Sequence, residues 1–465
     1  MRSMVEGYMT MIQKISREAS TSEPVTPPPS SGWSPSPSRD GEDKSSFAAA
    51  LPKLILLGLT VGLGFTMMGS FSTVQEGAKA ELALSDHALG LVQGLSAAIP
   101  LLLLSIPIGI AVDRTNRVRL LIGLAFAWTL GTALTAIAPG TPLLFAARML
   151  TAIGTTGGLT AALSLTADYC APAMRGRGTL VVSLGQRLGI AAAFALPGWL
   201  FGQLIAGALP AVGDLEPWRS THVLLALLSA ALLIPLLFLR EPERREVEAG
   251  PHAPFRVVAG ELWQRRAFLL PLFAGQVSVV MADSASFIWA APVLSREYGL
   301  HPGDFAGWMG LLIFGSGIGG AVLGGISADL GQKSGRHGFI LLGAVIAAGL
   351  GIPAALFPIS GDIALFAFAL GLLVLCGTLT GLVVAVALTV LLPNELRGLC
   401  IGAFIALAGL IGFGVAPSLV TAASSLMGGE QHLAPALALV GVVTSAISFF
   451  AFALAMRRVP EGLSR

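Results

Sequence analysis

The stretch Gly109-Ile-Ala-Val-Asp113-Arg114-Thr-Asn-Arg117 ends a long apolar run, and Gly325-Ile-Ser-Ala-Asp329-Leu-Gly-Gln-Lys333-Ser-Gly-Arg336 ends another, about half a chain later. In each stretch a glycine is followed four residues later by an aspartate, and then by basic residues. A motif that recurs at half-chain spacing indicates an internal duplication. Two membrane halves that rock against each other are a common architecture of transporters, so the repeat favours that class.

The composition places most of the chain in lipid. Of the 465 residues, 54% are hydrophobic and only 12% are charged, whereas a soluble domain carries about 25% charged residues. The three cysteines lie in or beside apolar stretches and are expected to be buried thiols. The six histidines have no metal-ligand spacing. No metal and no cofactor are therefore expected.

Apolar runs of about 20 residues or more, each long enough to cross a hydrocarbon layer of about 30 Å, recur from Leu51 onward. Their length and even hydrophobicity favour helices over barrel strands. The sequence therefore predicts an all-α integral membrane protein with about twelve transmembrane helices in two pseudo-symmetric six-helix bundles. The expected spans are 51–74, 88–112, 118–138, 142–168, 178–208, 221–239, 267–295, 304–328, 337–358, 362–392, 397–425 and 433–456.

The predicted domains follow from these spans. Residues 1–46, rich in proline and serine, are expected to form a disordered tail. An N-terminal bundle over 47–239 and a C-terminal bundle over 267–458 flank a charged linker, 240–266, and residues 459–465 form a short tail.

Basic residues predict the orientation. One side of this map holds the linker and most of the basic residues near span ends, while the other holds only Lys79, Arg219 and Arg296. The positive-inside rule then places both termini and the linker in the cytoplasm of a multi-pass cell-membrane protein. The basic residues near span ends on the cytoplasmic side are Arg114, Arg117, Arg119, Arg175, Arg177, Lys333, Arg336, Arg397, Arg457 and Arg458.

Taken together, these residues resemble the major facilitator superfamily over roughly 51–460. The loop signature of that family, glycine-x-x-x-aspartate-arginine followed by basic residues, matches Gly109 to Arg117, and the second copy matches with Leu330 where arginine is usual. The fourth-span arginine of the family matches Arg148. The turns at Pro172/Arg175/Gly176 and Pro393/Arg397/Gly398 are also similar to family patterns.

Within the superfamily, Leu82-Ala-Leu-Ser-Asp-His-Ala-Leu-Gly90 and Asp113-Arg114-Thr-Asn-Arg117 resemble the spinster-like branch, which includes lipid transporters. The chain departs from that branch at two acidic positions. It has Met67-Met68 where an aspartate-arginine pair is usual in the first span, and Thr155 where a glutamate is usual in the fourth. The coupling and the substrate of that branch are therefore not carried over.

The resemblance implies a cytoplasmic gate. It places Asp113 against the start of span 11, near Arg397, and by symmetry Asp329 against the start of span 5, near Arg177. An aspartate there would cap a helix N-terminus, a contact of about 0.3–2 kcal/mol. Arg114 or Arg117 could pair with Asp168, and Lys333 or Arg336 with Glu395. The alternative is that these charges only set topology.

Three ionisable residues, Arg148, Arg187 and Asp283, fall well within the spans. Each costs about 2.5–3.5 kcal/mol at a helix centre, so they are expected to face a cavity or one another. We expect the two arginines to form an anion clamp with Asp283 as a protonatable counter-ion; a permanent structural ion pair is the alternative. Gln186, Gln276 and Trp289 are weaker candidates for substrate contacts, and each could instead have a packing role.

These observations favour a secondary active transporter for a small anionic or amphipathic solute, coupled to a proton or sodium ion. A lipid transporter of the spinster-like type is the closest alternative. The chain has no phosphate-binding glycine loop and no catalytic constellation at membrane depth, so neither ATP hydrolysis nor an enzyme is expected. We expect a monomer surrounded by membrane lipids, with no nucleic-acid partner.

Overall fold

The computed structural model describes residues 37–244, 263–336, 338–392 and 406–459, together with the single positions 260, 400 and 404. Within these residues the fold is entirely helical, as predicted, and Ser46–Arg465 form one compact unit. The predicted tail and linker fall largely outside the described ranges. One boundary differs, because the first helix begins at Pro37 and so includes the last ten residues of the predicted tail.

The N-terminal half contains six long helices: α2 (Pro37–Leu82), α3 (Asp86–Arg114), α4 (Arg117–Ala136), α5 (Thr141–Tyr169), α6 (Arg175–Ile205) and α7 (Pro217–Leu237). Local sequence signals explain several boundaries. The side chains of Ser85 and Asn116 cap the starts of α3 and α4, and Pro217 begins α7 at a position where a missing N–H costs nothing.

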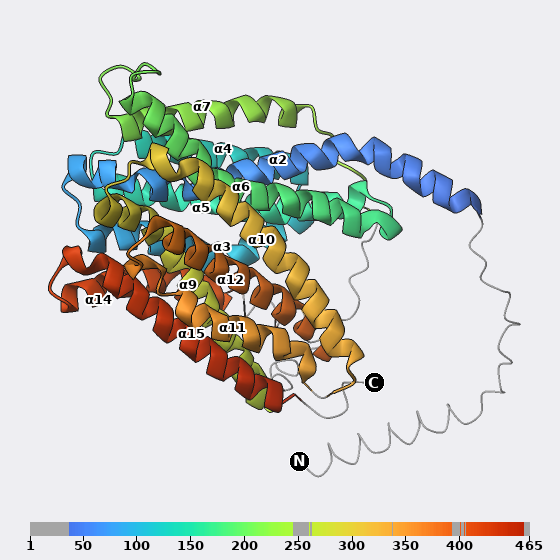
Figure 1. Ribbon diagram of the computed structural model, residues 1–465. Helices are drawn as coiled ribbons and strands as arrows, with labels where there is room; N and C mark the ends of the chain where they lie inside the picture. Colours follow the sequence, from blue (N-terminus) through green and yellow to red (C-terminus); the bar gives the residue numbers. More distant parts are fainter. Residues whose placement is uncertain are drawn as a thin grey trace, which may run out of the picture. The chain divides into compact units, whose positions relative to one another are not determined.

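The C-terminal half also contributes six helical spans. They are α9 (Arg266–Tyr298), α10 (Pro302–Lys333), α11 (Leu342–Ala354) between two short 3₁₀ turns, α12 (Ile363–Leu391), a π-helical segment η4 (Ala408–Val415) continued by α14 (Ala416–Leu426), and α15 (Leu433–Arg457). Figure 1 shows α7, α4 and α2, in green to blue, on one side of the molecule and α11, α14 and α15, in orange to red, on the other.

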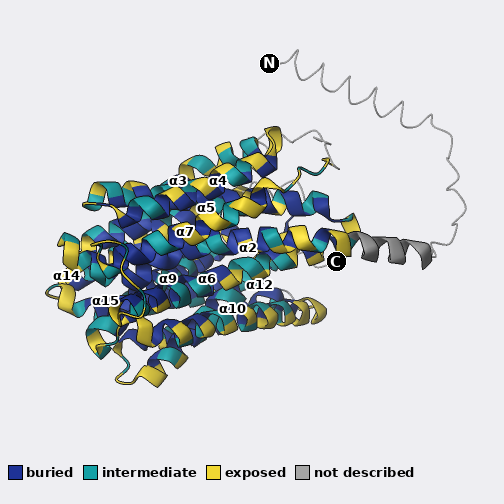
Figure 2. Cartoon of the chain, turned by 90° about the horizontal axis from the view of Figure 1, so that it is seen from above, coloured by how far each residue is buried: buried dark blue, intermediate teal, exposed yellow. Residues whose placement is uncertain are grey.

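Eleven helices in the described residues are long and apolar enough to cross a membrane. The twelfth, α5, is not among the eleven because threonine and glycine dilute its apolar residues. The two most buried spans are the first helices of the two halves, α2 at 67% and α9 at 78%, and Figure 2 shows α9 in the dark blue interior. Equivalent positions in the two halves thus have equivalent burial, as the duplication predicts.

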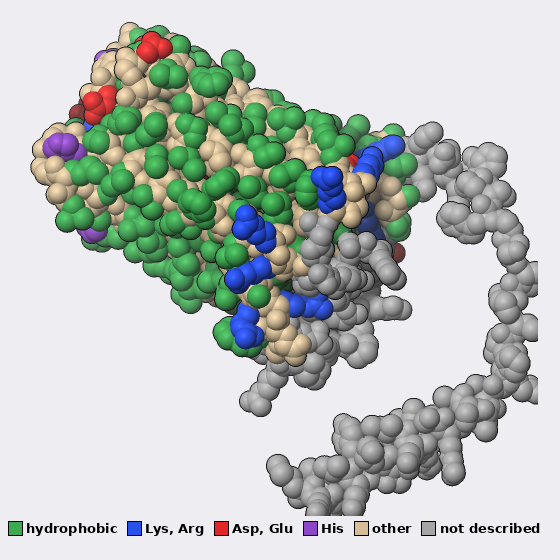
Figure 3. Space-filling view, turned by 60° about the horizontal axis from the view of Figure 1, so that its bottom comes forward, with side chains coloured by type: hydrophobic (Ala, Val, Ile, Leu, Met, Phe, Trp, Pro, Cys, Tyr) green, Lys and Arg blue, Asp and Glu red, His purple; other side chains and the backbone are tan. Residues whose placement is uncertain are grey.

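Both copies of the repeated motif lie at the same end of the molecule. Successive helices alternate in direction, so the end of α3 and the start of α6 lie on one side. Helices α6 and α10 are antiparallel neighbours, since Gly198 lies against Pro302 while Arg187 lies near Gly317. The end of α10 therefore lies beside the start of α6. Figure 3 shows a hydrophobic belt between an end with lysine and arginine and an end with acidic residues and histidine.

Close helix contacts inside each half depend on glycine. A Cβ added at Gly189 of α6 would lie 2.0 Å from the carbonyl oxygen of Gly62 in α2, so any side chain there would separate the two backbones. Small residues let helices approach in this way where lipid supplies no hydrophobic drive between them.

Candidate functional site

The two ends of the molecule differ in how the halves meet. We call the end that carries Asp113 and Asp329 the motif end, and the opposite end the cluster end. At the cluster end one hydrophobic core contains side chains of both halves, such as Phe71, Trp289 and Phe305. Towards the motif end each half has its own core. The halves are therefore joined by apolar packing mainly at the cluster end.

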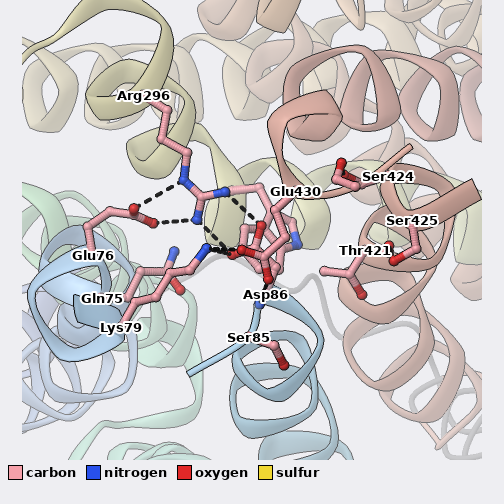
Figure 4. Close-up of polar contacts among 12 residues, drawn as sticks. Gln75, Glu76, Lys79, Ser85, Asp86, Arg296, Thr421, Ser424, Ser425 and Glu430 are labelled. Atoms are coloured by element: carbon pink, nitrogen blue, oxygen red, sulfur yellow. Dashed lines mark hydrogen bonds and ion pairs between the residues drawn. The ribbon is translucent and has the colours of Figure 1, made fainter. Parts of the chain in front are cut away.

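Five charged residues cross the seam between the halves at the cluster end (Figure 4). Arg296 of α9 bonds to Glu76 of α2 at 2.7 Å and to Asp86 of α3 at 2.6 Å. Lys79 of α2 bonds to Asp86 at 2.6 Å and to Glu430, in the turn before α15, at 2.5 Å. Glu430 also accepts a hydrogen bond from the backbone N–H of Asp86 at 2.7 Å. We call these five residues the charge cluster.

Asp86 is the centre of the charge cluster. Its side chain is only 2% exposed, and an isolated buried carboxylate would be strongly unfavourable. Two cations, one from each half, compensate it. Breaking a buried pair of this kind by removing one partner typically costs about 3–5 kcal/mol, so the cluster favours a conformation in which this end is closed.

A buried amide network continues the seam towards the membrane interior. Gln75 of α2 donates to the main-chain oxygen of Ile288 in α9 at 2.7 Å. Gln93 of α3 donates to the side-chain oxygen of Gln75 and accepts from Ser72 at 2.8 Å. Because each of its polar side chains is buried, the network is a specific polar contact between the halves.

At the motif end, the ion pairs within the described residues stay inside the N-terminal half. Arg117, at the start of α4, pairs with Asp168 at the end of α5, which is one of the two pairings that the sequence predicts for Asp168. Arg117 also bonds to Glu241 at 2.8 Å. The pairing is present, and a gating role for it remains a prediction.

The beginning of the linker is docked on this half, which the sequence analysis did not anticipate. The carboxylate of Glu241 accepts a hydrogen bond from the backbone N–H of Val118 at 2.9 Å, at the positive start of α4. Arg244 donates to the main-chain oxygens of Val112 and Thr115, each at 2.9 Å, and of Asp113. A cation thus meets the negative C-terminal end of α3, so the first linker residues fix the conformation of the first motif loop.

The remaining gate residues have no contact across the seam in the described part of the chain. Asp113, Arg114, Asp329 and Lys333 are exposed, and the guanidinium of Arg336 stacks on Phe339 of its own half. Among the described residues, no hydrogen bond or ion pair joins Asp329 to the start of α6. Two predicted partners, Glu395 and Arg397, lie outside the described residues.

Arg148 is buried in α5 and contacts α2. Its guanidinium donates to the main-chain oxygens of Met67, at 3.1 Å, and of Met68, and lies 5.7 Å from the ring centre of Phe71. Its Nε has no hydrogen-bond partner. These contacts all lie in the N-terminal half and use both terminal nitrogens of the guanidinium, which favours a packing role in this conformation.

Arg187 and Asp283 approach each other across the seam without forming an ion pair. Arg187 is exposed on α6 and its side chain lies near Gly317 of α10, and it interacts electrostatically with Asp283 of α9. The carboxylate of Asp283 lies against Gly377 of α12. Of the three predicted intramembrane charges, two are within electrostatic range of each other without a direct contact, and Arg148 lies in a separate environment.

The three weaker candidates for substrate contacts also lie in different environments. Trp289 is fully buried and donates to the main-chain oxygen of Pro417 at 3.2 Å, so it has the environment of a core residue. Gln276 is buried against Gly381, and its side-chain oxygen has no partner. Gln186 is partly exposed on α6, beside Arg187.

Sequence reasoning missed the charge cluster, although a signal was present. Lys79 and Arg296 are two of the three basic residues on that side of the predicted membrane, and acidic residues lie at the ends of the neighbouring spans. The third, Arg219, bonds to Glu81 at 2.9 Å inside the N-terminal half. Scarce cations next to span-end acids could have indicated ion pairs.

The fold resembles solved transporters. A bacterial homologue of the human lysosomal transporter Spinster, solved in an inward-facing and unoccupied conformation, superposes with a TM-score of 0.73 at 21% identity, over 88% of this chain and 97% of that chain. The occupied inward-facing form gives 0.72 at 21% identity, over 88% and 96%. A variant of the nucleoside transporter NupG gives 0.68 at 12% identity, over 88% and 100%.

At these identities the structures establish the fold alone. No curated protein matches the sequence. A profile of the Major Facilitator Superfamily matches residues 54–417, a range that holds both copies of the motif and ends near the start of α14. The chain therefore belongs to the Major Facilitator Superfamily of membrane transporters, with spinster-like similarity.

Proposed function

We propose that this chain is a secondary active transporter that moves a small anionic or amphipathic solute by alternating access, coupled to a proton or sodium ion. The structure corresponds to the conformation that is closed at the cluster end. One observation carries this proposal: a shared core and a five-residue charge cluster join the halves at one end, whereas the motif end has separate cores.

The motif end is proposed to face the cytoplasm. Lysine and arginine side chains gather there (Figure 3), and cytoplasmic loops carry an excess of these residues. The chain is then a multi-pass cell-membrane protein, monomeric, with both termini inside and an inward-facing conformation. The proposal contains no enzymatic step.

Lipid transport is the second candidate, favoured by the apolar surface of α3. Leu101 is in contact with Gly409 of η4, but beyond it Leu102, Leu103 and Ile106 are exposed, Ile106 at 73%. A lateral passage beside these residues would suit a lipid, whereas an arginine-lined central cavity would suit a soluble anion.

The alternating-access proposal is tested by linking the halves at the cluster end. In proteoliposomes, the Lys79→Cys, Glu430→Cys double variant is joined with a short, reducible thiol cross-linker. Uptake of a solute identified from a panel of organic anions and fluorescent phospholipids is expected to stop, and to return after reduction. A control pair, Tyr298→Cys with Ser360→Cys, lies within the C-terminal half and should leave transport active when linked. Continued uptake by the fully linked Lys79–Glu430 pair would refute alternating access.

The same panel separates the two substrate classes. Arg148→Ala is expected to abolish binding of an anionic solute if the arginine joins a substrate clamp in any conformation. Normal affinity in this variant would instead assign Arg148 to helix packing, as its present contacts suggest. Flipping of fluorescent phospholipid without uptake of any organic anion would favour the lipid alternative.

A further inference from the structure

A small cavity of about 20 Å³ lies inside the C-terminal half, separate from the seam at the cluster end. It is lined by side chains of α9, α11, α12 and α15. Its polar lining consists of Asp283, Thr380, Ser445 and Ser448, with the Cys376 thiol beside them. A volume of this size holds about one water molecule or one small ion.

Two oxygen atoms at this cavity are buried and have no hydrogen-bond partner among the described residues. They are Oδ1 of Asp283 and Oγ of Ser448, and Ser448 is fully buried. Buried polar atoms in proteins nearly always have a partner, so each exception needs an explanation. The need for a partner is greatest for a carboxylate at membrane depth, because its desolvation cost is large.

The packing of α9 on α12 directs the carboxylate towards this cavity. A Cβ added at Gly377 would lie 2.3 Å and 2.5 Å from the two carboxylate oxygens of Asp283, so only glycine leaves room for the group. Two helical turns earlier on the same face of α9, Gln276 lies against Gly381 of α12, and its side-chain oxygen also has no partner. The α9–α12 contact thus holds two polar side chains that each have an oxygen without a partner in the described residues.

No cation of the described chain neutralises this carboxylate directly. Arg187, on α6 of the other half, interacts with it electrostatically but forms no ion pair. The other polar groups at the cavity, Thr380, Ser445 and Ser448, are neutral hydroxyls. One carboxylate and three hydroxyl groups are therefore among the side chains that line a volume of ionic size, and the rest of the lining carries no side-chain oxygen.

We propose that this cavity is a binding site for one sodium ion. Oxygen-only donor sets suit hard cations, and a single carboxylate is balanced by one positive charge, which favours a monovalent over a divalent ion. Asp283 is the charged ligand, and the hydroxyls of Thr380, Ser445 and Ser448 are the neutral ones. A role as the coupling ion rests on the proposed transport function, whereas binding itself does not.

The location of this site in the fold would allow a bound sodium ion to influence transport. The site connects four helices of the C-terminal half near the middle of α9, the helix that also carries Arg296 at the cluster end. Bound sodium would neutralise Asp283 and weaken its attraction to Arg187 across the seam. Occupancy would then alter the relative stability of conformations that differ in how the halves meet.

The test measures sodium binding directly on the purified full-length protein in lipid nanodiscs. Thermal unfolding and equilibrium binding of radioactive sodium are recorded in sodium chloride, and unfolding also in choline chloride at equal ionic strength. A ligand that binds only the folded state raises its stability with occupancy. A saturable, sodium-specific rise in Tm is expected, together with about one bound ion per chain.

Two variants locate the site. Asp283→Asn should abolish the sodium effect, and Ser448→Ala, which keeps the charge, should weaken the apparent sodium affinity about tenfold or more. The matched control is Glu297→Gln, an exposed acid on the same helix, and it should bind sodium as the wild type does. Because Ser448→Ala removes one hydroxyl alone, it still decides the question if Asp283→Asn fails to fold.

Three results would overturn the proposal. They are no sodium-specific stabilisation of the wild type, wild-type sodium affinity in Ser448→Ala or in a folded Asp283→Asn, or stabilisation by acid alone, which would indicate a protonated Asp283 beside a water molecule. A protein that binds sodium at this site but transports nothing would refute the proposed function and leave the ion site intact.

Discussion

The cluster end and the motif end carry similar side-chain chemistry in opposite arrangements. At the cluster end, Arg296 and Lys79 join acids of both halves across the seam. At the motif end, Arg117 makes a comparable set of ion pairs entirely inside the N-terminal half. Ion pairs across a seam favour one conformation over another, whereas ion pairs inside a half stabilise every conformation in which that half moves as a rigid body.

This difference gives the two sets of charges separate roles. The charge cluster stabilises the state that is closed at the cluster end, and its ion pairs across the seam must break when that end opens. The contacts of Arg117, Glu241 and Arg244 hold the first motif loop on its own helices. Mutations in the charge cluster should therefore shift the conformational equilibrium, whereas mutations in the contacts of Arg117 should lower the stability of the protein.

The largest effect is expected for Arg296→Ala. The variant leaves Asp86 with one cation and Glu76 with none, a penalty of about 3 kcal/mol, the low end for a buried pair because Arg296 is partly exposed. That penalty falls only on the closed state and shifts the equilibrium about 100-fold. Spin labels at Asp214→Cys and Gln431→Cys, exposed loop positions in the two halves, should move apart.

Arg296→Lys is the matched control for this prediction. It keeps the charge but loses the planar fork that reaches two carboxylates at once, so an intermediate shift is expected. A label distance in Arg296→Ala that equals the wild-type distance would mean that the charge cluster does not hold this end closed.

A smaller effect, of a different kind, is expected for Arg117→Ala. The side chain of Arg117 is buried with two carboxylate partners, and its loss should lower the free energy of unfolding by about 2–3 kcal/mol. Thermal unfolding should show the loss, while the label distance at the cluster end stays at the wild-type value. Arg114→Ala, at an exposed position without an ion pair among the described residues, should change stability by less than about 0.5 kcal/mol. A label distance that rises as far as in Arg296→Ala would remove the distinction between the two ends.

The sequence predicts the parts of this structure that depend on local pattern. Apolar length predicts twelve spans, and the repeat predicts two halves. The span map places Arg117 and Asp168 at the ends of neighbouring spans on one side of the membrane, which makes their pairing foreseeable. The charge cluster depends instead on residues that are distant in sequence, such as Lys79 and Glu430, which are 351 residues apart. No periodicity in the chain specifies which helix ends meet across the seam.

Intramembrane charges show a second limit of sequence reasoning. The cost of burying Arg148 predicts that it has partners, but it does not tell a ligand from a helix backbone. In the structure the partners are the carbonyl oxygens of Met67 and Met68. The same argument applied to Asp283 predicts a compensating group, and only the fold shows that neutral hydroxyls surround it.

The smallest effect on stability is expected for Asp113→Asn. The side chain is exposed and has no ion pair within the described residues, so the free energy of unfolding should change by less than about 0.5 kcal/mol.

A latch that forms only when the motif end closes would still lose a helix-dipole contact of about 0.3–2 kcal/mol. Turnover should then fall about 2- to 30-fold while substrate affinity stays nearly constant, and Asp329→Asn should act in the same way because its motif is the second copy. The measurement is initial uptake rate against substrate affinity in both variants. Wild-type turnover in both would show that these aspartates only set topology, and a loss in one alone would show that the duplicated loops no longer share one role.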